Sequence, residues 1–279
     1  RSSDLGNLTN INLSNLAIEI EPVKNLTFQT GFSYRTLESA SPTFSLDYYT
    51  DDTYTTTKSK VKQSEVNLEI EYTPNKKTVG YGVERLNVDS PYSRVFVNYS
   101  QGFKGLMNSD FDYSKIQLYY KQPITIGPLG RTNLTLELGK TFGKVPLGLM
   151  SVIPGNQTYF VIGNTFSNLN FYEFVSDRYA TFQWEHNFQG RLLSRIPLMR
   201  KLNWREIVGV RSVYGDVSNE NRLLNASGLI YKAPITPYWE YSVGIGNIFK
   251  VFRIDASCFN SIKLCLYSFQ SGSVISFLI

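Results

Sequence analysis

Apolar and polar residues alternate one by one along much of this chain of 279 residues, and no stretch of comparable length keeps a helical period. In residues 66–72, for example, Val66, Leu68, Ile70 and Tyr72 are separated by asparagine and glutamate, and residues 16–21 and 134–139 behave alike. Successive side chains of a β-strand point to opposite faces, so each stretch forms a ribbon with one apolar and one polar side. The sequence therefore predicts an all-β chain whose apolar face needs a partner.

The strands predicted from this alternation, with turn-forming Pro, Gly, Asn and Asp residues in the gaps between them, are 10–22, 25–37, 43–57, 60–73, 78–88, 92–103, 113–124, 131–142, 158–166, 178–189, 204–215, 223–232, 238–249, 252–259, 264–269 and 273–279. Bacterial outer-membrane barrels have an even number of antiparallel strands. We therefore expect a transmembrane antiparallel β-barrel of about 14 strands, within a range of 12 to 16. The apolar last strand, with an aromatic residue near its end, is typical of such barrels. Residues 1–279 are predicted to form one barrel domain, which can be the C-terminal part of a longer protein.

Two observations bear on the membrane. The longest uncharged stretch, 145–172, is interrupted by proline and glycine and so does not predict a spanning helix. Charged residues make up 18% of the chain, below the roughly 25% of soluble domains. If the chain crosses a bilayer, it must do so as a closed barrel. A soluble β-sandwich would show the same alternation, but 279 residues without a domain boundary argue against it.

The residues that could carry chemistry are few. The chain has one histidine, His186, and its strand position on the parity of Phe182, Trp184 and Phe188 indicates a packed or interfacial side chain. No glycine-rich phosphate loop, metal-ligand cluster or nucleophile elbow occurs in the sequence. We therefore predict no catalytic residues, no cofactor and no metal, and the scattered basic residues, net charge +5, do not predict nucleic-acid binding.

Charged residues lie beside aromatic ones in the segment from 155 to 215. Because buried charges persist only when they are paired, we expect a charge network inside the barrel that plugs or stiffens it. The residues predicted to form this network are Glu173, Asp177, Arg178, Arg205 and Glu206.

A second cluster is basic and apolar, without any acid, between 191 and 205. Such a segment is typical of a connection that lies in a membrane interface and contacts lipid phosphates, and an ordinary charged turn explains it equally well. The residues predicted to contact phosphates are Arg191, Arg195, Arg200 and Lys201.

Two cysteines, Cys258 and Cys265, would lie opposite each other if a hairpin turns at residues 261–262. A cross-strand disulfide is then geometrically feasible in an oxidising compartment. Two unrelated strand cysteines are an equally good reading of the same spacing.

Four segments carry a family resemblance: Asn-Gln-Thr-Tyr at 156–159, Tyr-Glu-Phe-Val-Ser-Asp-Arg-Tyr at 172–179, Arg-Ile-Pro-Leu-Met-Arg-Lys-Leu-Asn-Trp-Arg-Glu at 195–206, and Gly-Ile-Gly-Asn-Ile-Phe-Lys-Val-Phe-Arg-Ile-Asp at 244–255. From Gly102 onward, the chain resembles the C-terminal barrel of a Bacteroidetes outer-membrane family known as carboxypeptidase-like regulatory-domain proteins of unknown function. The resemblance implies a barrel distantly similar to outer-membrane assembly and surface-antigen barrels, preceded in the family by a periplasmic β-sandwich. Ala256, Ser257 and Cys258 stand where the family has Trp-Arg-Leu, so the last hairpin departs from it.

Three functions follow as hypotheses. The first is a non-enzymatic integral β-barrel of the bacterial outer membrane, a structural or accessory subunit of an envelope complex for assembly, secretion or transport. Its expected partners are outer-membrane lipids, phospholipid or lipopolysaccharide, and other outer-membrane or periplasmic proteins. The second is an insertase or translocase-like barrel with an opening seam, although its Arg-Gly-aromatic tip is absent from the sequence. The third is an outer-membrane hydrolase that uses His186.

Overall fold

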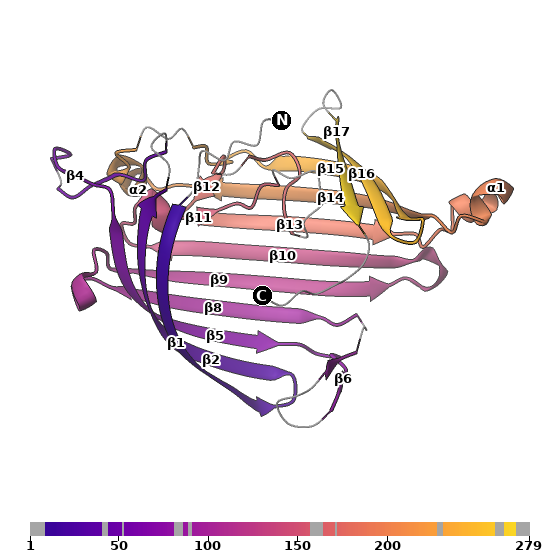
Figure 1. Ribbon diagram of the computed structural model, residues 1–279, viewed down its shortest axis with the longest axis horizontal. Coiled ribbons are helices and arrows are strands. Elements are labelled where there is room, and N and C mark those ends of the chain that lie inside the picture. Colours follow the sequence, from indigo (N-terminus) through magenta and orange to yellow (C-terminus); the bar gives the residue numbers. More distant parts are fainter. Residues whose placement is uncertain are drawn as a thin grey trace.

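The computed structural model describes residues 9–40, 44–51, 53–80, 86–88, 91–156, 164–170, 172–227, 231–259 and 265–271. Eleven strands form one antiparallel sheet (Figure 1). Their order in the sheet follows the chain: β1 (Thr9–Val23), β2 (Leu26–Ser39), β5 (Val61–Tyr72), β8 (Arg94–Phe103), β9 (Tyr113–Thr125), β10 (Arg131–Phe142), β13 (Arg178–Asn187), β14 (Arg205–Asp216), β15 (Tyr238–Ile248), β16 (Phe252–Phe259) and β17 (Cys265–Ser271).

The remaining elements are short and lie in the connections. Three two-stranded pieces pair β3 (Tyr48–Tyr49) with β4 (Thr57–Lys58), β6 (Thr78–Val79) with β7 (Leu86–Asn87), and β11 (Ser151–Val152) with β12 (Val175–Ser176). The helices are α1 (Pro197–Arg200), α2 (Asn219–Leu224), and the 3-10 turns η1 (Leu106–Asn108), η2 (Gly127–Leu129), η3 (Leu147–Leu149) and η4 (Leu193–Arg195). Within the described residues, every helix is too short or too polar to cross a membrane.

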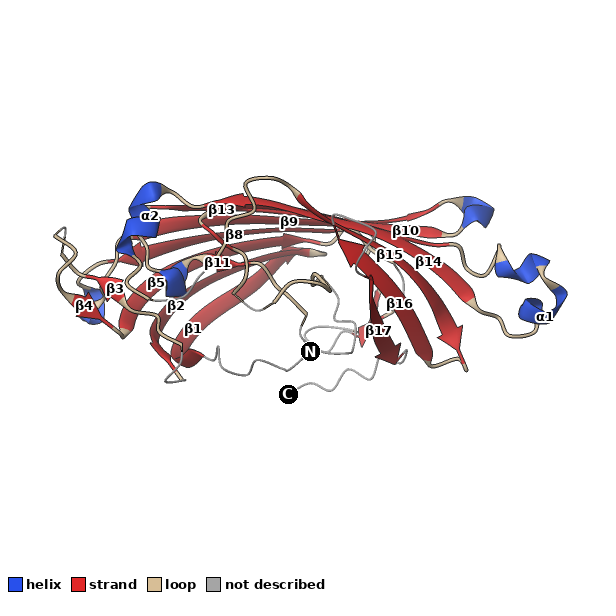
Figure 2. Ribbon diagram, turned by 90° about the horizontal axis from the view of Figure 1, so that it is seen from above, coloured by secondary structure: helices blue, strands red, loops and turns tan. Residues whose placement is uncertain are grey.

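The sheet is bent into an arch (Figure 2). We call its two ends the α1 end and the α2 end, after the helix that lies at each (Figure 1). The α1 end carries connections 126–130, 188–204 and 249–251, and the α2 end carries 40–60, 104–112, 143–177 and 217–237. β1 and β17 are the edges of the sheet, and no ladder joins them in the described part of the chain.

The register gives the sheet two chemically different faces. Residues that pair across neighbouring strands share a face, and one such row runs Ile70, Val97, Leu118, Leu138 and Ala180. The row beside it, on the other face, contains Glu69, Asn98, Gln117, Gly139 and Tyr179. We call these the apolar face and the polar face. The apolar face is open to solvent in the isolated chain, with Leu138 46% and Val243 64% exposed.

The polar face is the concave one. The described part of connection 143–177 runs inside the arch (Figure 2), and the Asn164 side-chain amide donates to the Tyr119 hydroxyl of the polar face at 3.3 Å. The buried apolar side chains gather beneath this connection and its neighbours at the α2 end, in two clusters. The first includes Leu37, Leu46, Val61, Leu147 and Val175, and the second includes Ile153, Phe166, Leu169, Phe174 and Val213. The core therefore lies between the sheet and its own connections, and no second sheet covers the apolar face among the described residues.

The structure confirms the all-β class. The described sheet has eleven strands and no ladder between its edges, and the expected count of about 14 strands is not confirmed. Among the described residues, predicted strand 43–57 is mostly a loop around the β3–β4 pair, and 78–88 contains the short β6 and β7. Predicted strand 223–232 begins inside helix α2. Asn221 of this helix is held by hydrogen bonds to Val145 and Asp177, which lie far away in the sequence. Predicted strand 273–279 and most of 158–166 lie outside the described residues.

The two cysteines lie in the last hairpin of the described sheet. Cys258 of β16 pairs in register with Cys265 of β17, and Cys258 is disulfide-bonded. Of the two readings left open by the sequence, the cross-strand one holds.

Gly102 of β8 allows an aromatic ring to lie across the polar face. The Tyr113 ring of β9 occupies the space beside it, and a Cβ on Gly102 would lie 2.6 Å from Tyr113 Cε1 and 2.7 Å from Gln63 Nε2. Real Cβ atoms do not approach so closely, so we expect Gly102→Ala to destabilise the fold by about 1–3 kcal/mol. Urea unfolding in detergent, followed by tryptophan fluorescence, measures the change.

Gly148→Ala is the matched control, because its Cβ would meet only Leu37 and Leu46 methyl groups at 3.8 and 3.9 Å. This variant is expected to unfold at the wild-type urea concentration. Equal shifts for the two variants would show that close packing at Gly102 is not the cause.

Candidate functional site

The polar face carries the chain's largest group of inward charges. The register of the strands places positively and negatively charged residues on this face: Arg35, Glu65, Glu69, Glu71, Arg94, Lys115, Lys121, Glu137, Glu185, Arg211, Glu240, Arg253 and Asp255. Charges on the concave side of a curved sheet are stable only where water or partners reach them. The polar face is therefore the place where the fold can bind polar ligands or hold a plug.

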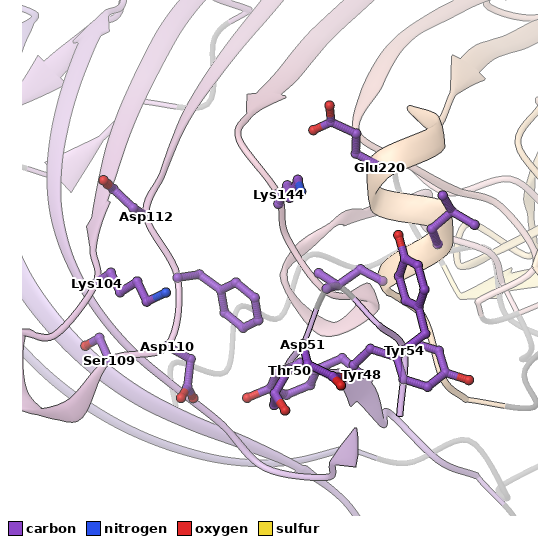
Figure 3. Close-up of a pocket in the computed structure, with 14 residues that line it drawn as sticks. Tyr48, Thr50, Asp51, Tyr54, Lys104, Ser109, Asp110, Asp112, Lys144 and Glu220 are labelled. Atoms are coloured by element: carbon purple, nitrogen blue, oxygen red, sulfur yellow. The ribbon is translucent and has the colours of Figure 1, made fainter. Parts of the chain in front are cut away.

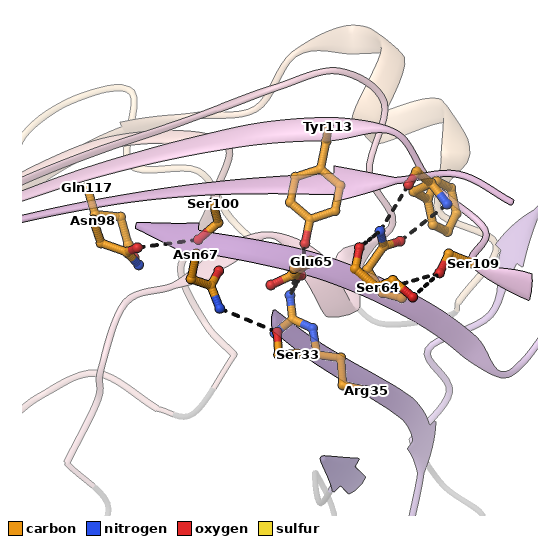
Figure 4. Close-up of polar contacts among 12 residues, drawn as sticks. Ser33, Arg35, Ser64, Glu65, Asn67, Asn98, Ser100, Ser109, Tyr113 and Gln117 are labelled. Atoms are coloured by element: carbon orange, nitrogen blue, oxygen red, sulfur yellow. Dashed lines mark hydrogen bonds and ion pairs between the residues drawn. The ribbon is translucent and has the colours of Figure 1, made fainter. Parts of the chain in front are cut away.

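An ion pair that is half-buried at Arg35 and buried at Glu65 links three strands of this face, together with Tyr113 (Figure 4). The Arg35 guanidinium of β2 pairs with the Glu65 carboxylate of β5, and the Tyr113 hydroxyl of β9 donates to the same carboxylate. Arg35 Nη2 also donates to the Tyr113 hydroxyl at 3.1 Å. Gly102 of β8 pairs with both Glu65 and Tyr113, so its lack of a side chain leaves room for the ring. The carboxylate is satisfied from both sides, which suits a cross-link better than a proton-transfer role.

Glu240 of β15 anchors the inward connection. Its carboxylate is 1% exposed and accepts the backbone N–H groups of Ser167 and Asn168 at 2.9 and 2.8 Å. The Tyr238 hydroxyl donates to it at 3.0 Å, and Arg211 donates to the Ser167 hydroxyl at 3.1 Å. Charged acceptors make stronger hydrogen bonds than neutral ones. One buried carboxylate thus fixes the connection on the polar face, a role that sequence analysis missed although Glu240 lies on the polar parity of an aromatic strand.

The predicted network of Glu173, Asp177, Arg178, Arg205 and Glu206 does not form as one group. Asp177 is buried and accepts the Ser218 backbone N–H at 2.7 Å and the Asn221 side-chain amide at 2.9 Å. Arg178 is exposed and pairs with Asp216, and Glu173 accepts the Asn170 N–H at 3.0 Å. Arg205 and Glu206 begin β14 at the α1 end, whereas Arg178 pairs in register with the last residue of β14. The two halves lie a strand's length apart.

A pocket of about 570 Å³ opens at the α2 end between the β3–β4 loop, connection 104–112 and α2 (Figure 3). Its lining carries both signs of charge: Asp51, Asp110, Asp112, Glu220, Lys104 and Lys144. Burial, with a smaller contribution from Asp110, raises the pKa of the Tyr48 hydroxyl there. Asp110 pairs with Lys58 and accepts the Lys62 N–H at 2.8 Å. These contacts hold the loops together, and with Lys58 counted the four carboxylates exceed the lysines by only one.

Two smaller pockets on the polar face are more basic. One of about 360 Å³ is lined by Arg94, Lys121 and Arg131, and Arg94 pairs with Glu71 at 2.8 Å. Its neighbour of about 210 Å³ is lined by Lys121, Arg211 and Arg253, and Arg253 pairs with Glu185 and Asp255. Pairing within the face thus offsets part of this charge.

The predicted phosphate contacts lie together. Arg191, Arg195, Arg200 and Lys201 all belong to connection 188–204, which projects beyond the sheet at the α1 end (Figure 1). Arg191 is half-buried and the other three are exposed. Leu198 between them is 73% exposed, so basic and apolar side chains share one surface. Glu206 accepts the Leu193 N–H and fixes the base of this connection to β14.

His186 is buried against the β9–β10 turn. Its Nε2 lies 3.0 Å from the Leu129 carbonyl oxygen, to which it must donate because a carbonyl only accepts. Its Nδ1 lies 2.7 Å from the Thr132 hydroxyl, and the ring packs edge-on against Phe188. Both nitrogens are occupied in a way that orders the turn.

Comparisons with known proteins place these features in context. The "Family of unknown function (DUF5686) C-terminal domain" matches residues 3–221. No curated protein matches the chain. Among solved structures, BamA from Haemophilus ducreyi lacking POTRA domains 1–3 is similar, with 11% identity, a TM-score of 0.55, and coverage of 96% of this chain and 55% of that chain. OccK11 (OpdR) from Pseudomonas aeruginosa matches at 8% identity and a TM-score of 0.36, over 95% of this chain and 71% of that chain.

The likeness to BamA shows the fold: the open sheet has the architecture of an outer-membrane β-barrel. The chain spans 55% of the length of that structure.

Loss of the Glu240 charge is expected to release the inward connection. Glu240→Gln keeps the side chain's size but removes a charged acceptor worth about 1.5–3 kcal/mol. We expect hydrogen exchange of the amides in residues 164–170 to accelerate about 10- to 100-fold, measured by mass spectrometry on the protein in detergent. Glu19→Gln, an exposed polar-face residue of β1, is the control and should leave this segment unchanged. Unaltered hydrogen exchange in Glu240→Gln would contradict the role of Glu240 as the anchor of this connection.

Asp51 orders the β3–β4 loop, and its effect depends on pH. Hydrogen bonds from the Thr53 and Thr55 hydroxyls, with the Thr56 N–H, lower the pKa of the Asp51 carboxyl. A lowered folded pKa means that the contribution is complete above the unfolded value of about 3.9 and disappears only as pH falls below it. In an NMR titration, the Thr55 amide of the wild-type protein should therefore still report the ordered loop at pH 4. In Asp51→Ala, the same amide should report a loop that is not ordered at any pH. A wild-type transition at or above pH 3.9 would contradict this.

Proposed function

We propose that this chain, which belongs to the DUF5686 family through that family's C-terminal domain, forms an integral β-barrel of the bacterial outer membrane with a structural or accessory, non-enzymatic role in an envelope complex. The role, the membrane and the partners are proposals drawn from the two faces of the sheet.

The apolar face carries this proposal. Strands β8, β9, β10, β13, β14 and β15 have 10 to 13 residues each, and a tilted strand needs about 9–11 residues to cross a bilayer. Their outward side chains, such as Leu118 and Leu138, remain solvent-exposed in the chain. Apolar area of this extent is unfavourable in water and calls for a covering medium. Hydrocarbon supplies that cover without a second protein layer.

The polar face supports a structural role. Its buried carboxylates, Glu65 and Glu240, are fully engaged in holding a tyrosine, an arginine and an inward connection in place. Groups in this state stiffen a sheet rather than exchange protons with a substrate. The lumen is thereby narrowed at the α2 end, where both apolar clusters lie.

The proposed partners are outer-membrane lipids, phospholipid or lipopolysaccharide, and other outer-membrane or periplasmic proteins. Connection 188–204 is the proposed lipid contact, through Arg191, Arg195, Arg200 and Lys201. Basic side chains beside apolar ones suit the boundary between headgroups and acyl chains.

An insertase or translocase-like barrel is the second candidate function. One observation favours it: β1 is an edge strand of 15 residues whose outer ladder is unpaired among the described residues. An unpaired edge is a template for another strand. Depletion of the protein in cells would then lower the abundance of other outer-membrane barrels. Unchanged abundance leaves the structural role as the better account.

Neighbouring residues on opposite faces test the membrane assignment. Leu118 lies on the apolar face at the middle of β9, and Gln117 lies on the polar face beside it. Arginine on the lipid face of a barrel costs about 2–4 kcal/mol near the bilayer midplane. Leu118→Arg is therefore expected to lower the unfolding free energy in lipid vesicles by that amount, and Gln117→Arg by much less.

Heat-modifiable migration on gels and co-fractionation with outer membranes are expected for the wild-type protein. In water alone, Leu118→Arg would be harmless because the residue is already exposed. Recovery of a stable, detergent-free soluble monomer in which both variants are tolerated would end the membrane proposal.

A further inference from the structure

A basic pocket of about 610 Å³ lies at the α1 end, between connection 188–204 and the β15–β16 turn. Four cationic side chains line it, namely Arg191, Arg200, Arg205 and Lys250, together with the amide side chains of Asn203 and Asn247. No acidic residue is among its lining residues in the described part of the chain. Four cations without a counter-charge repel one another unless water or an anion lies between them.

The backbone around this pocket is held in an unusual conformation. Asn203, Asn247, Phe249 and Lys250 all have positive φ, at 52°, 63°, 50° and 67°. Asparagine tolerates this region, whereas a phenylalanine there is strained. The Asn247 side-chain amide donates to the Asn203 carbonyl oxygen at 2.7 Å and ties the two connections together. Asn203 and Asn247, 44 residues apart in the sequence, are thus brought together beside the turn that carries Lys250.

The two connections that form the pocket also carry exposed apolar side chains. Phe249 in the strained turn is 83% exposed, and Leu198 of α1 is the most exposed of the large apolar residues in its connection. Ile196, Leu202 and Val251 are exposed as well. A soluble anion would gain nothing from these side chains. A lipid would contact both groups at once, with its phosphate at the cations and its acyl chains beside the apolar residues.

We propose that this pocket binds the phosphate group of an anionic membrane lipid. Guanidinium groups bind phosphate oxygens through paired, charge-assisted hydrogen bonds, and Arg191, Arg200 and Arg205 can supply several such donors. Lys250 adds a fourth positive charge from a separate hairpin. The inference rests on the proposed membrane location and adds to it a defined site and ligand chemistry.

The residues that line this pocket differ from the phosphate contacts predicted from the sequence. Arg191 and Arg200 line it, as expected for phosphate contacts, whereas Arg195 and Lys201 are not among its lining residues. Arg205, predicted to join a lumenal network, lines it instead. Lys250 was assigned no role, because only the pairing of β14 with β15 places its turn beside connection 188–204.

Native mass spectrometry of the full chain in detergent tests the site. The probe is phosphatidylglycerol, with phosphatidylcholine of the same acyl chains as the neutral reference. Each basic residue near a membrane surface contributes about fivefold in affinity for anionic lipid. The double variant Arg200→Gln with Lys250→Gln is therefore expected to bind phosphatidylglycerol about 25-fold more weakly than wild type, with phosphatidylcholine binding unchanged.

Two control variants isolate the cause. Lys104→Gln with Lys232→Gln removes the same charge from exposed residues of the α2 end and should keep wild-type binding. The double variant Arg200→Lys with Lys250→Arg keeps both positive charges and should retain most of the wild-type phosphatidylglycerol binding. Equal phosphatidylglycerol binding by wild type and the Gln double variant overturns the proposal.

Further experiments distinguish a lipid phosphate from free phosphate as the ligand, and test membrane insertion separately. Competition by lipid A supports the same phosphate chemistry, whereas displacement of phosphatidylglycerol by millimolar inorganic phosphate overturns the lipid assignment. Insertion of wild type into neutral vesicles is scored separately. Failure to insert ends the proposed function, whereas insertion without preference for phosphatidylglycerol ends only this inference.

Discussion

The structure depends on one constraint, the period-two alternation of side chains kept in register across neighbouring hydrogen-bonded strands. In the row from Ile70 through Leu118 to Leu138, every member faces outward, and one residue away Glu69, Gln117 and Gly139 face inward. A slip of one residue in any ladder would place glutamate on the apolar face and leucine in the concave side. The register therefore decides which side chains lie on the concave polar face and which remain exposed on the apolar face.

The polar face shows what the concave side does with its charges. Arg35, Glu65 and Tyr113 tie three strands together, and Glu240 fixes the inward connection by its backbone amides. Glu65, Tyr113 and Glu240 are buried and Arg35 is half-buried, and each of them is engaged by a hydrogen bond or an ion pair. At the α1 end, four cationic side chains line one pocket, and exposed apolar residues lie in the same connections. The two ends of the sheet thus differ, with packed and paired groups at one and a cluster of cations at the other.

Local patterns predicted the central strands well and long-range contacts poorly. Predicted strands 113–124 and 131–142 agree closely with β9 and β10, because alternation is a property of neighbouring residues. The predicted strand 223–232 was wrong at its start, where helix α2 lies, and Asn221 of this helix contacts Val145 and Asp177, which no local window contains. Arg205 and Arg178 were grouped by composition, but antiparallel pairing puts them at opposite ends of β13 and β14. The anchor Glu240 and the pocket residue Lys250 depend on tertiary proximity in the same way.

The most direct test of the account asks what the apolar face contacts. Leu118→Trp and Gln117→Trp, each made in a chain whose three native tryptophans are replaced by phenylalanine, place a single fluorophore on one face or the other. After reconstitution, phospholipids brominated on the acyl chain should quench the tryptophan at 118 strongly and the tryptophan at 117 weakly. Equal and weak bromolipid quenching at both positions, with ready quenching by aqueous acrylamide, would contradict a hydrocarbon-covered face.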